Sequence, residues 1–173
     1  MDYKIHISGL AQGSYVYEFP VKGDLFQEFD NQQIKDADIN VKVTLEKGSG
    51  WMNAVIEGQG TTTVECDRCL DDLEVPVSFN ESLAIRSARL GEETETSDEF
   101  MIVDPSEAEV DLKQFIYDYI CVNMPLVSVH PEGKCNPQML AKLDSLRSAD
   151  GKGQEDNDIY SPFSGLKDLL KKK

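Results

Sequence analysis

Four side chains in two short segments have the types and spacing of a metal site. Two residues separate Cys66 from Cys69 in the stretch ECDRCL, and four residues separate His130 from Cys135 in HPEGKC. Thiolates and a neutral imidazole are common ligands of tetrahedral zinc, and ligand pairs on turns gather such a set. If the fold brings the two turns together, Cys66, Cys69, His130 and Cys135 are the candidate ligands, and Zn²⁺ is the candidate cofactor.

Two other interpretations of the Cys66 and Cys69 pair stay open. A thioredoxin-type redox pair lies at the start of a helix after a parallel strand, where the helix dipole lowers the thiol pKa. Strand-like sequence flanks this pair on both sides and no βαβ pattern is visible, which disfavours the redox interpretation. The cysteines also fit a tight connection between strands as small buried residues, with His130 exposed beside Pro131.

The rest of the sequence offers little to a catalytic site. It has two histidines and contains no G-x-S-x-G, P-loop or G-x-G-x-x-G motif, so we predict no catalytic residue. Arg68, inside the cysteine turn, is a candidate binding residue because a fixed guanidinium can hold a phosphate or carboxylate. Pairing with Asp67, Asp71 or Asp72 is the alternative. Trp51 fits hairpin packing better than a base-stacking platform.

Composition and charge indicate a globular cytoplasmic protein. Hydrophobic residues make up 40% of the 173 residues, and neither an export signal nor a membrane-spanning run is visible. The thiols are therefore expected to stay reduced. A net charge of −15 disfavours non-specific nucleic-acid binding. It favours basic protein partners, or RNA contact confined to a local patch, although such a charge also serves solubility alone.

Alternating apolar residues predict strands at 3–8 and 13–21, and a meander of three strands between residues 37 and 86. In the first strand of this meander, Ile39, Val41, Val43 and Leu45 share one face. Gly58 and Gly60 suggest a bulge or bend in the second. In the third, Val75, Val77 and Phe79 are in phase. The stretch GDLFQEFD, residues 23–30, favours a short helical segment.

The second half of the chain favours helices separated by polar segments. Residues 111–122 form the clearest helix, with Asp111 as N-cap and Pro125 after its end. Its apolar stripe comprises Leu112, Phe115, Ile116, Tyr119 and Ile120. We predict one α+β domain over 1–147, with an acidic loop at about 90–110 that holds an apolar island at 100–103, and a shorter helix near 136–147. A polar linker and an amphipathic basic tail follow over 148–173, with these candidate binding residues: Phe163, Leu166, Leu169, Lys171, Lys172 and Lys173.

Four stretches, taken in order, resemble the bacterial YceD-like family of large ribosomal RNA subunit accumulation proteins. They are ECDRCL (65–70), EVDLKQFIYDYI (109–120), MPLVSVHPEGKC (124–135) and PFSGLKDLLKKK (162–173). The resemblance covers most of the chain and is strongest from Glu65 to Cys135. Many relatives carry more cysteines in the segment where this chain has His130 and Cys135. The resemblance implies a cytoplasmic, non-enzymatic factor that sustains the level of large-subunit ribosomal RNA.

We therefore expect an α+β fold with a curved antiparallel sheet, partly barrel-like, capped by one main helix and followed by a tail. The expected function is support of 23S ribosomal RNA accumulation or processing through binding. The expected partner is large-subunit RNA or a pre-50S particle, contacted directly or through a basic ribosomal protein, with no membrane involved. The alternative is a small zinc-stabilised protein-interaction module without a ribosomal role.

Overall fold

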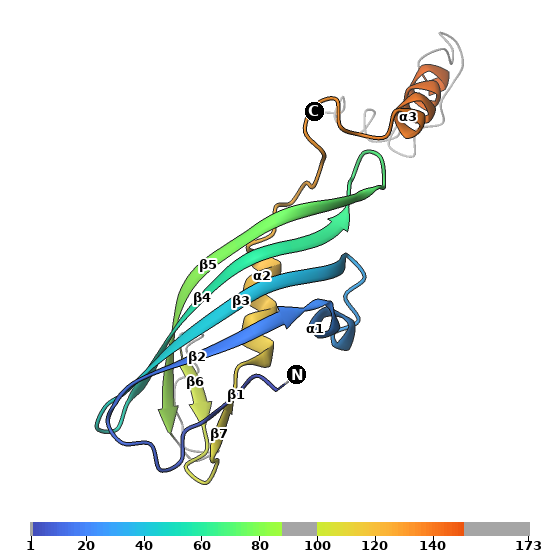
Figure 1. Ribbon diagram of the computed structural model, residues 1–173. Coiled ribbons are helices and arrows are strands. Elements are labelled where there is room, and N and C mark those ends of the chain that lie inside the picture. The colour runs from blue at the N-terminus through green and yellow to red at the C-terminus, as the bar shows by residue number, and fades with distance from the viewer. Residues whose placement is uncertain (1, 88–99, 151–173) are drawn as a thin grey trace, which may run out of the picture. The chain divides into compact units, whose positions relative to one another are not determined.

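The computed structural model of this protein describes residues 2–87 and 100–150 (Figure 1). The chain divides into two compact units, Met1–Cys135 and Asn136–Lys173. The first unit holds all the strands and the first two helices, and the second holds the helix α3 (Pro137–Asp150). The expected boundary at residue 147 stays a prediction. The candidate tail residues Phe163 to Lys173 lie outside the described residues.

The first unit is organised around a curved five-stranded sheet (Figure 1). Its strands follow one another in the order β2 (Gly13–Lys22), β3 (Ile34–Lys47), β4 (Met52–Glu65), β5 (Asp72–Ser87) and β6 (Phe100–Val103). Strands β2 to β5 are antiparallel neighbours, which confirms the predicted meander, whereas β6 is parallel to β5. The apolar island at 100–103 is thus a strand.

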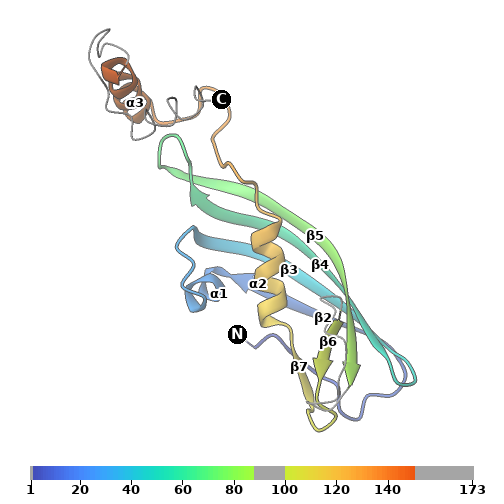
Figure 2. The same ribbon diagram turned by 180° about the vertical axis from the view of Figure 1, so that it is seen from behind.

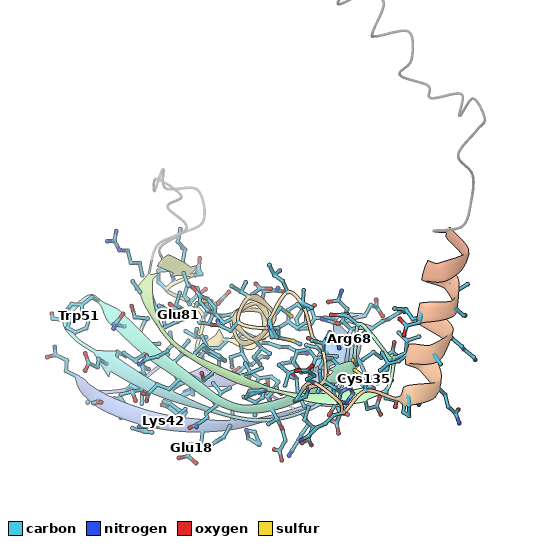
Figure 3. All side chains as sticks on the ribbon, turned by 90° about the horizontal axis from the view of Figure 1, so that it is seen from above. Glu18, Lys42, Trp51, Arg68, Glu81 and Cys135 are labelled. Atoms are coloured by element: carbon cyan, nitrogen blue, oxygen red, sulfur yellow. The ribbon has the colours of Figure 1, made fainter. Side chains whose placement is uncertain are left out.

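The sheet buries one face and exposes the other. Ile39, Val41, Val43 and Leu45 are almost fully buried, as their alternation predicts. On the opposite face Lys42 pairs with Glu57 across β3 and β4, with 3.5 Å between Nζ and Oε2. Figure 3 shows Lys42 projecting from the side of the sheet away from the helix α2. One-sided burial of this kind is typical of antiparallel sheets.

Two details of the expected sheet differ in the structure. The sheet does not close into a barrel: among the described strands, β2 and β6 are its two edges. The glycines of β4 form no bulge either, because β4 pairs with β5 in unbroken register from Met52 to Glu65. A Cβ on Gly60 would stand 2.1 Å from the Asp38 carbonyl oxygen. This glycine therefore permits a close approach of β3, and the irregularity of register lies in β3, between Ile34 and Asp36.

A two-stranded sheet joins the chain start to the segment before α2. In it, β1 (Lys4–His6) pairs antiparallel with β7 (Glu109–Asp111), and Ile5 and Val110 are buried. Strand β7 overlaps the end of the segment, about 90–110, for which we expected an acidic loop. Its three residues are too short for an alternating pattern to be recognised in sequence, and backbone pairing with β1 decides its conformation.

The helix α2 (Lys113–Val122) lies across the concave face of the sheet (Figure 2). Its N-cap Leu112 and its residues Ile116 and Ile120 are fully buried, and Tyr119 places its ring 6.3 Å from that of Phe79 on β5. Leu112, rather than the expected Asp111, is the N-cap residue. Asp111 still accepts the Lys113 amide at 2.9 Å, which satisfies one free helix donor.

The structure also contains α1 (Gly23–Glu28) and α3, at the two places where the sequence predicts shorter helical segments. The short helix α1 buries Leu25 and Phe26, and Phe29 just after it stacks on Tyr117 of α2 with ring centroids 4.1 Å apart. The predicted second short helix corresponds to α3. In residues 2–87 and 100–150, no helix has the length and apolar character needed to cross a membrane.

Replacing Ile116 by alanine should destabilise the first unit strongly. The side chain is fully buried between α2 and the sheet, so its truncation should cost roughly 2–5 kcal/mol of the free energy of unfolding. Gln114→Ala is the control on the same helix, because Gln114 is exposed and such changes usually stay within about 0.5 kcal/mol. Urea denaturation measures both, and equal losses would contradict this packing.

Candidate metal centre

Strand alternation places the first cysteine on the inner face of the sheet. Thr62 and Val64 are buried on the inner side of β4, and Cys66, two residues later, continues that phase into the turn. The Leu70 amide donates to the Cys66 carbonyl at 2.9 Å, and the Cys66 amide donates to the Asp71 carbonyl at 2.9 Å. The turn is therefore closed by its own backbone, and it also buries the Cys69 side chain.

The second pair of ligands reaches the same place from the end of α2. The Asp67 amide donates to the Ser128 carbonyl at 2.8 Å, and the Ser128 amide donates to Asp67 Oδ2 at 2.6 Å. These reciprocal hydrogen bonds fasten the segment before His130 to the cysteine turn. Beyond His130 the chain turns again, with Gly133 at φ 79° and the Lys134 amide donating to the Pro131 carbonyl. This second turn returns Cys135 to the cluster.

The ligand atoms of Cys66, Cys69, His130 and Cys135 all lie within 4.8 Å of one another. Cys66 Sγ is 3.9 Å from Cys135 Sγ, and Cys69 Sγ is 3.4 Å from His130 Nδ1. Around tetrahedral zinc, the usual bond lengths separate two sulfur atoms by about 3.8 Å and a sulfur from a nitrogen by about 3.6 Å. The cluster is therefore close enough to hold a metal ion, and its spacing is compatible with zinc.

Burial and chemistry also suit a metal ligand set. The three cysteines are buried and His130 is half-buried, and all of the chain's cysteines are free thiols. The three thiols and the imidazole fill a tetrahedral set, so no protein ligand is missing. Figure 3 shows Cys135 and Arg68 together at the end of the sheet opposite Trp51.

The cluster shifts its thiol pKa values in opposite directions. Burial raises the pKa of Cys66, but hydrogen bonds from the backbones of His130, Arg68 and Cys69 outweigh burial and lower it to about 6. Burial raises the pKa of Cys135, and its contacts with Cys66 and Cys69 raise it further. Cys66 is therefore the thiol that the protein itself prepares as a thiolate, the form that binds metals.

The other residues singled out in the sequence lie outside the cluster. Arg68 is exposed, and in the described part of the chain its guanidinium forms no ion pair or hydrogen bond; Asp72 bonds to Lys35 instead, at 2.7 Å. Trp51 lies over Gly48 at the β3–β4 hairpin, as hairpin packing predicts, and it is exposed rather than part of the core. Cys121 is half-buried on α2, where the Asn31 amide approaches its sulfur at 3.7 Å.

Sequence reasoning missed the residues that join the two turns. In the sequence Asp67 is a candidate partner of Arg68, and nothing distinguishes Ser128. An acidic residue beside a metal-binding cysteine is a common surface feature, so its type carries no signal. What matters is the backbone pairing of two segments distant in sequence, which no local pattern shows. Leu70, at φ 62°, likewise adopts the left-handed backbone conformation, which its residue type does not predict.

In the reduced, metal-free protein, one thiolate should form at unusually low pH. Because the surrounding backbone stabilises ionised Cys66, its ultraviolet thiolate absorbance should appear with a midpoint near pH 6, against an ordinary pKa of 9.0. Cys66→Ser should remove this step. Cys121→Ser is the control that should retain it, since burial raises the pKa of Cys121. A titration in which every thiolate forms only near pH 9 would refute this electrostatic arrangement.

Comparison with protein families places this sequence in a known group. Residues 56–170 match the family model described as Large ribosomal RNA subunit accumulation protein YceD. The match contains both ligand turns and the helix α2 between them. Searches of curated proteins and of solved structures found no match. Because the match covers more than half of the chain, the protein belongs to the YceD family, whose name associates it with accumulation of large-subunit ribosomal RNA.

Proposed function

We propose that this protein is a non-enzymatic, cytoplasmic ribosome-biogenesis factor that supports accumulation or processing of 23S ribosomal RNA. It acts by binding large-subunit RNA or an early ribosomal protein in a pre-50S particle. The observation that carries the proposal is the family match over residues 56–170. The family's name describes the accumulation of an RNA and no reaction.

The charge of the chain favours a protein-mediated contact. At −15 the protein repels a polyanion over most of its surface, whereas ribosomal proteins that hold RNA are basic and are attracted to it. Arg68 is the described candidate for a direct phosphate contact, because its guanidinium is exposed on a backbone-closed turn. The basic tail residues Lys171, Lys172 and Lys173 are proposed as a second contact.

We propose further that Cys66, Cys69, His130 and Cys135 bind one Zn²⁺ ion with a structural role. Four protein ligands complete a tetrahedral shell, whereas a catalytic zinc keeps one position open for water or substrate. The ion would join the β4–β5 turn to the segment after α2. The alternative function, a zinc-stabilised interaction module without a ribosomal role, uses the same site, so metal binding alone does not separate the two.

The protein purified under reducing conditions should contain one zinc ion per chain. Cys66→Ser and Cys135→Ser should lose it, because each removes one of the four ligands, and metal analysis of the purified protein measures this. Zinc at a hundredfold above its Kd should stabilise the wild-type protein by about 2.7 kcal/mol.

Cys121→Ser is the matched control for this metal analysis. Cys121 lies on α2 outside the cluster, so this variant should bind zinc as the wild type does. Equal zinc content in all three serine variants would rule out the proposed site.

Cells that lack the protein should show a lower ratio of 23S to 16S ribosomal RNA, and the wild-type gene should restore it. In sucrose gradients the protein should co-sediment with pre-50S particles, and crosslinking in cells should identify the RNA or protein that it touches. Free migration at all salt concentrations, together with an unchanged RNA ratio, would contradict the proposed function. It would favour the interaction module without a ribosomal role.

A further inference from the structure

A groove of about 510 Å³ lies beside the cysteine and histidine cluster, between the ends of β3 and β4 and the segment after α2. Its apolar lining includes Ile34, Val64, Met124 and Leu126. Its polar lining includes Asn31, Gln32 and Gln33. Its acidic lining residues are Glu65, which also pairs with Lys35 outside the groove at 2.9 Å, and Asp67. The groove thus combines an apolar lining with negative charge, and we call it the docking groove.

Large apolar side chains are exposed around this groove. Leu126, which lines it, is 102% exposed, and Val127 and Val122 in the same segment of the chain are also exposed. These residues belong to a segment that hydrogen bonds and packing already hold, so their exposure is not that of a chain end. Exposed apolar residues gathered beside a groove are typical of an interaction site.

Leu70 adds an independent observation on the adjoining cysteine turn. Its φ of 62° lies in the left-handed region, which glycine adopts without cost and a leucine does not. The side chain is nevertheless large and 57% exposed, so burial in this structure does not account for a leucine here. The backbone conformation belongs to the closed turn, in which the Leu70 amide donates to the Cys66 carbonyl, so what Leu70 adds is an exposed apolar side chain beside the cysteine turn.

We propose that the docking groove binds a basic peptide segment of a protein partner. An apolar residue of that segment packs against Leu126 and Met124, and a neighbouring lysine or arginine faces the carboxylates of Glu65 and Asp67. The same carboxylates repel the phosphates of RNA, so charge favours a peptide as occupant. This inference rests on the proposed function only for the source of the peptide, a protein of the large ribosomal subunit.

Peptide binding in the docking groove should depend on the metal cluster, because residues that line the groove also join the two ligand turns. Asp67 and Ser128 both line the groove, and their reciprocal hydrogen bonds join the two ligand turns. A metal ion held between those turns would keep these walls in place. Removal of the ion should therefore weaken peptide binding, even though no ligand side chain lines the groove.

The test uses the full-length zinc-loaded chain and fluorescently labelled overlapping peptides that span the large-subunit ribosomal proteins. Fluorescence anisotropy should detect binding of lysine- or arginine-rich peptides that carry an apolar residue. Leu126→Ser should weaken binding about tenfold or more, because it removes a fully exposed apolar contact without affecting the core. Val16→Ser, at an exposed apolar site on β2 away from the groove, should leave binding unchanged.

A charge variant tests the acidic half of the groove. Glu65→Gln should weaken binding and reduce its dependence on salt, whereas Glu74→Gln, at an exposed acidic position on β5 that does not line the groove, should do neither. Chelation of the metal should weaken binding of the wild-type chain. Binding that withstands both Leu126→Ser and Glu65→Gln would overturn the proposal.

Other occupants would also overturn it. Ultracentrifugation would reveal a second copy if the wild-type chain dimerised and Leu126→Ser abolished the dimer. A labelled RNA hairpin whose binding required Leu126 would identify an RNA occupant. If the protein sustains 23S ribosomal RNA but binds no peptide, the docking inference alone fails. If peptides bind through Leu126 but the protein never joins pre-50S particles, the proposed function alone fails.

Discussion

One-sided burial of the curved sheet is the constraint on which the rest of the first unit depends. The inner face of β3, β4 and β5 is apolar, and only a cover on the concave side removes it from water. The helix α2 provides that cover through Leu112, Ile116 and Ile120. Its position then directs the following segment toward the end of the sheet where β4 turns into β5. The cluster is assembled where these two chain paths meet.

Hydrogen bonds join the two ligand turns without a metal ion. Cys66 stays in the inward phase of β4, and Asp67 and Ser128 join the turns through two reciprocal hydrogen bonds. Backbone donors also lower the pKa of Cys66 to about 6 although burial opposes this. Ligands prepared in this way lose less entropy on binding an ion, which is the advantage of a preorganised site.

Much of this arrangement follows from sequence because its causes are local. Period-two alternation predicts the meander of β3 to β5, and the apolar stripe from Leu112 to Ile120 predicts α2. The chemistry of the residues predicts that the two ligand turns approach each other, because each pair supplies only half of a tetrahedral ligand set. The features that the sequence did not predict depend on pairing between segments distant in the chain. The backbone of β1 fixes β7, the approach of β3 explains Gly60, and Ser128 holds Asp67.

The acidic character of the chain and its role in an RNA process are compatible if contact is local and mediated by protein. A uniform charge of −15 would hinder approach to ribosomal RNA, whereas it would attract a basic protein segment. In the proposed docking, the groove would concentrate this attraction beside an apolar surface, where a partner would gain burial as well as charge neutralisation. Because Asp67 and Ser128 line the groove and also join the two ligand turns, loss of the metal would act on partner binding through geometry rather than through chemistry at the metal.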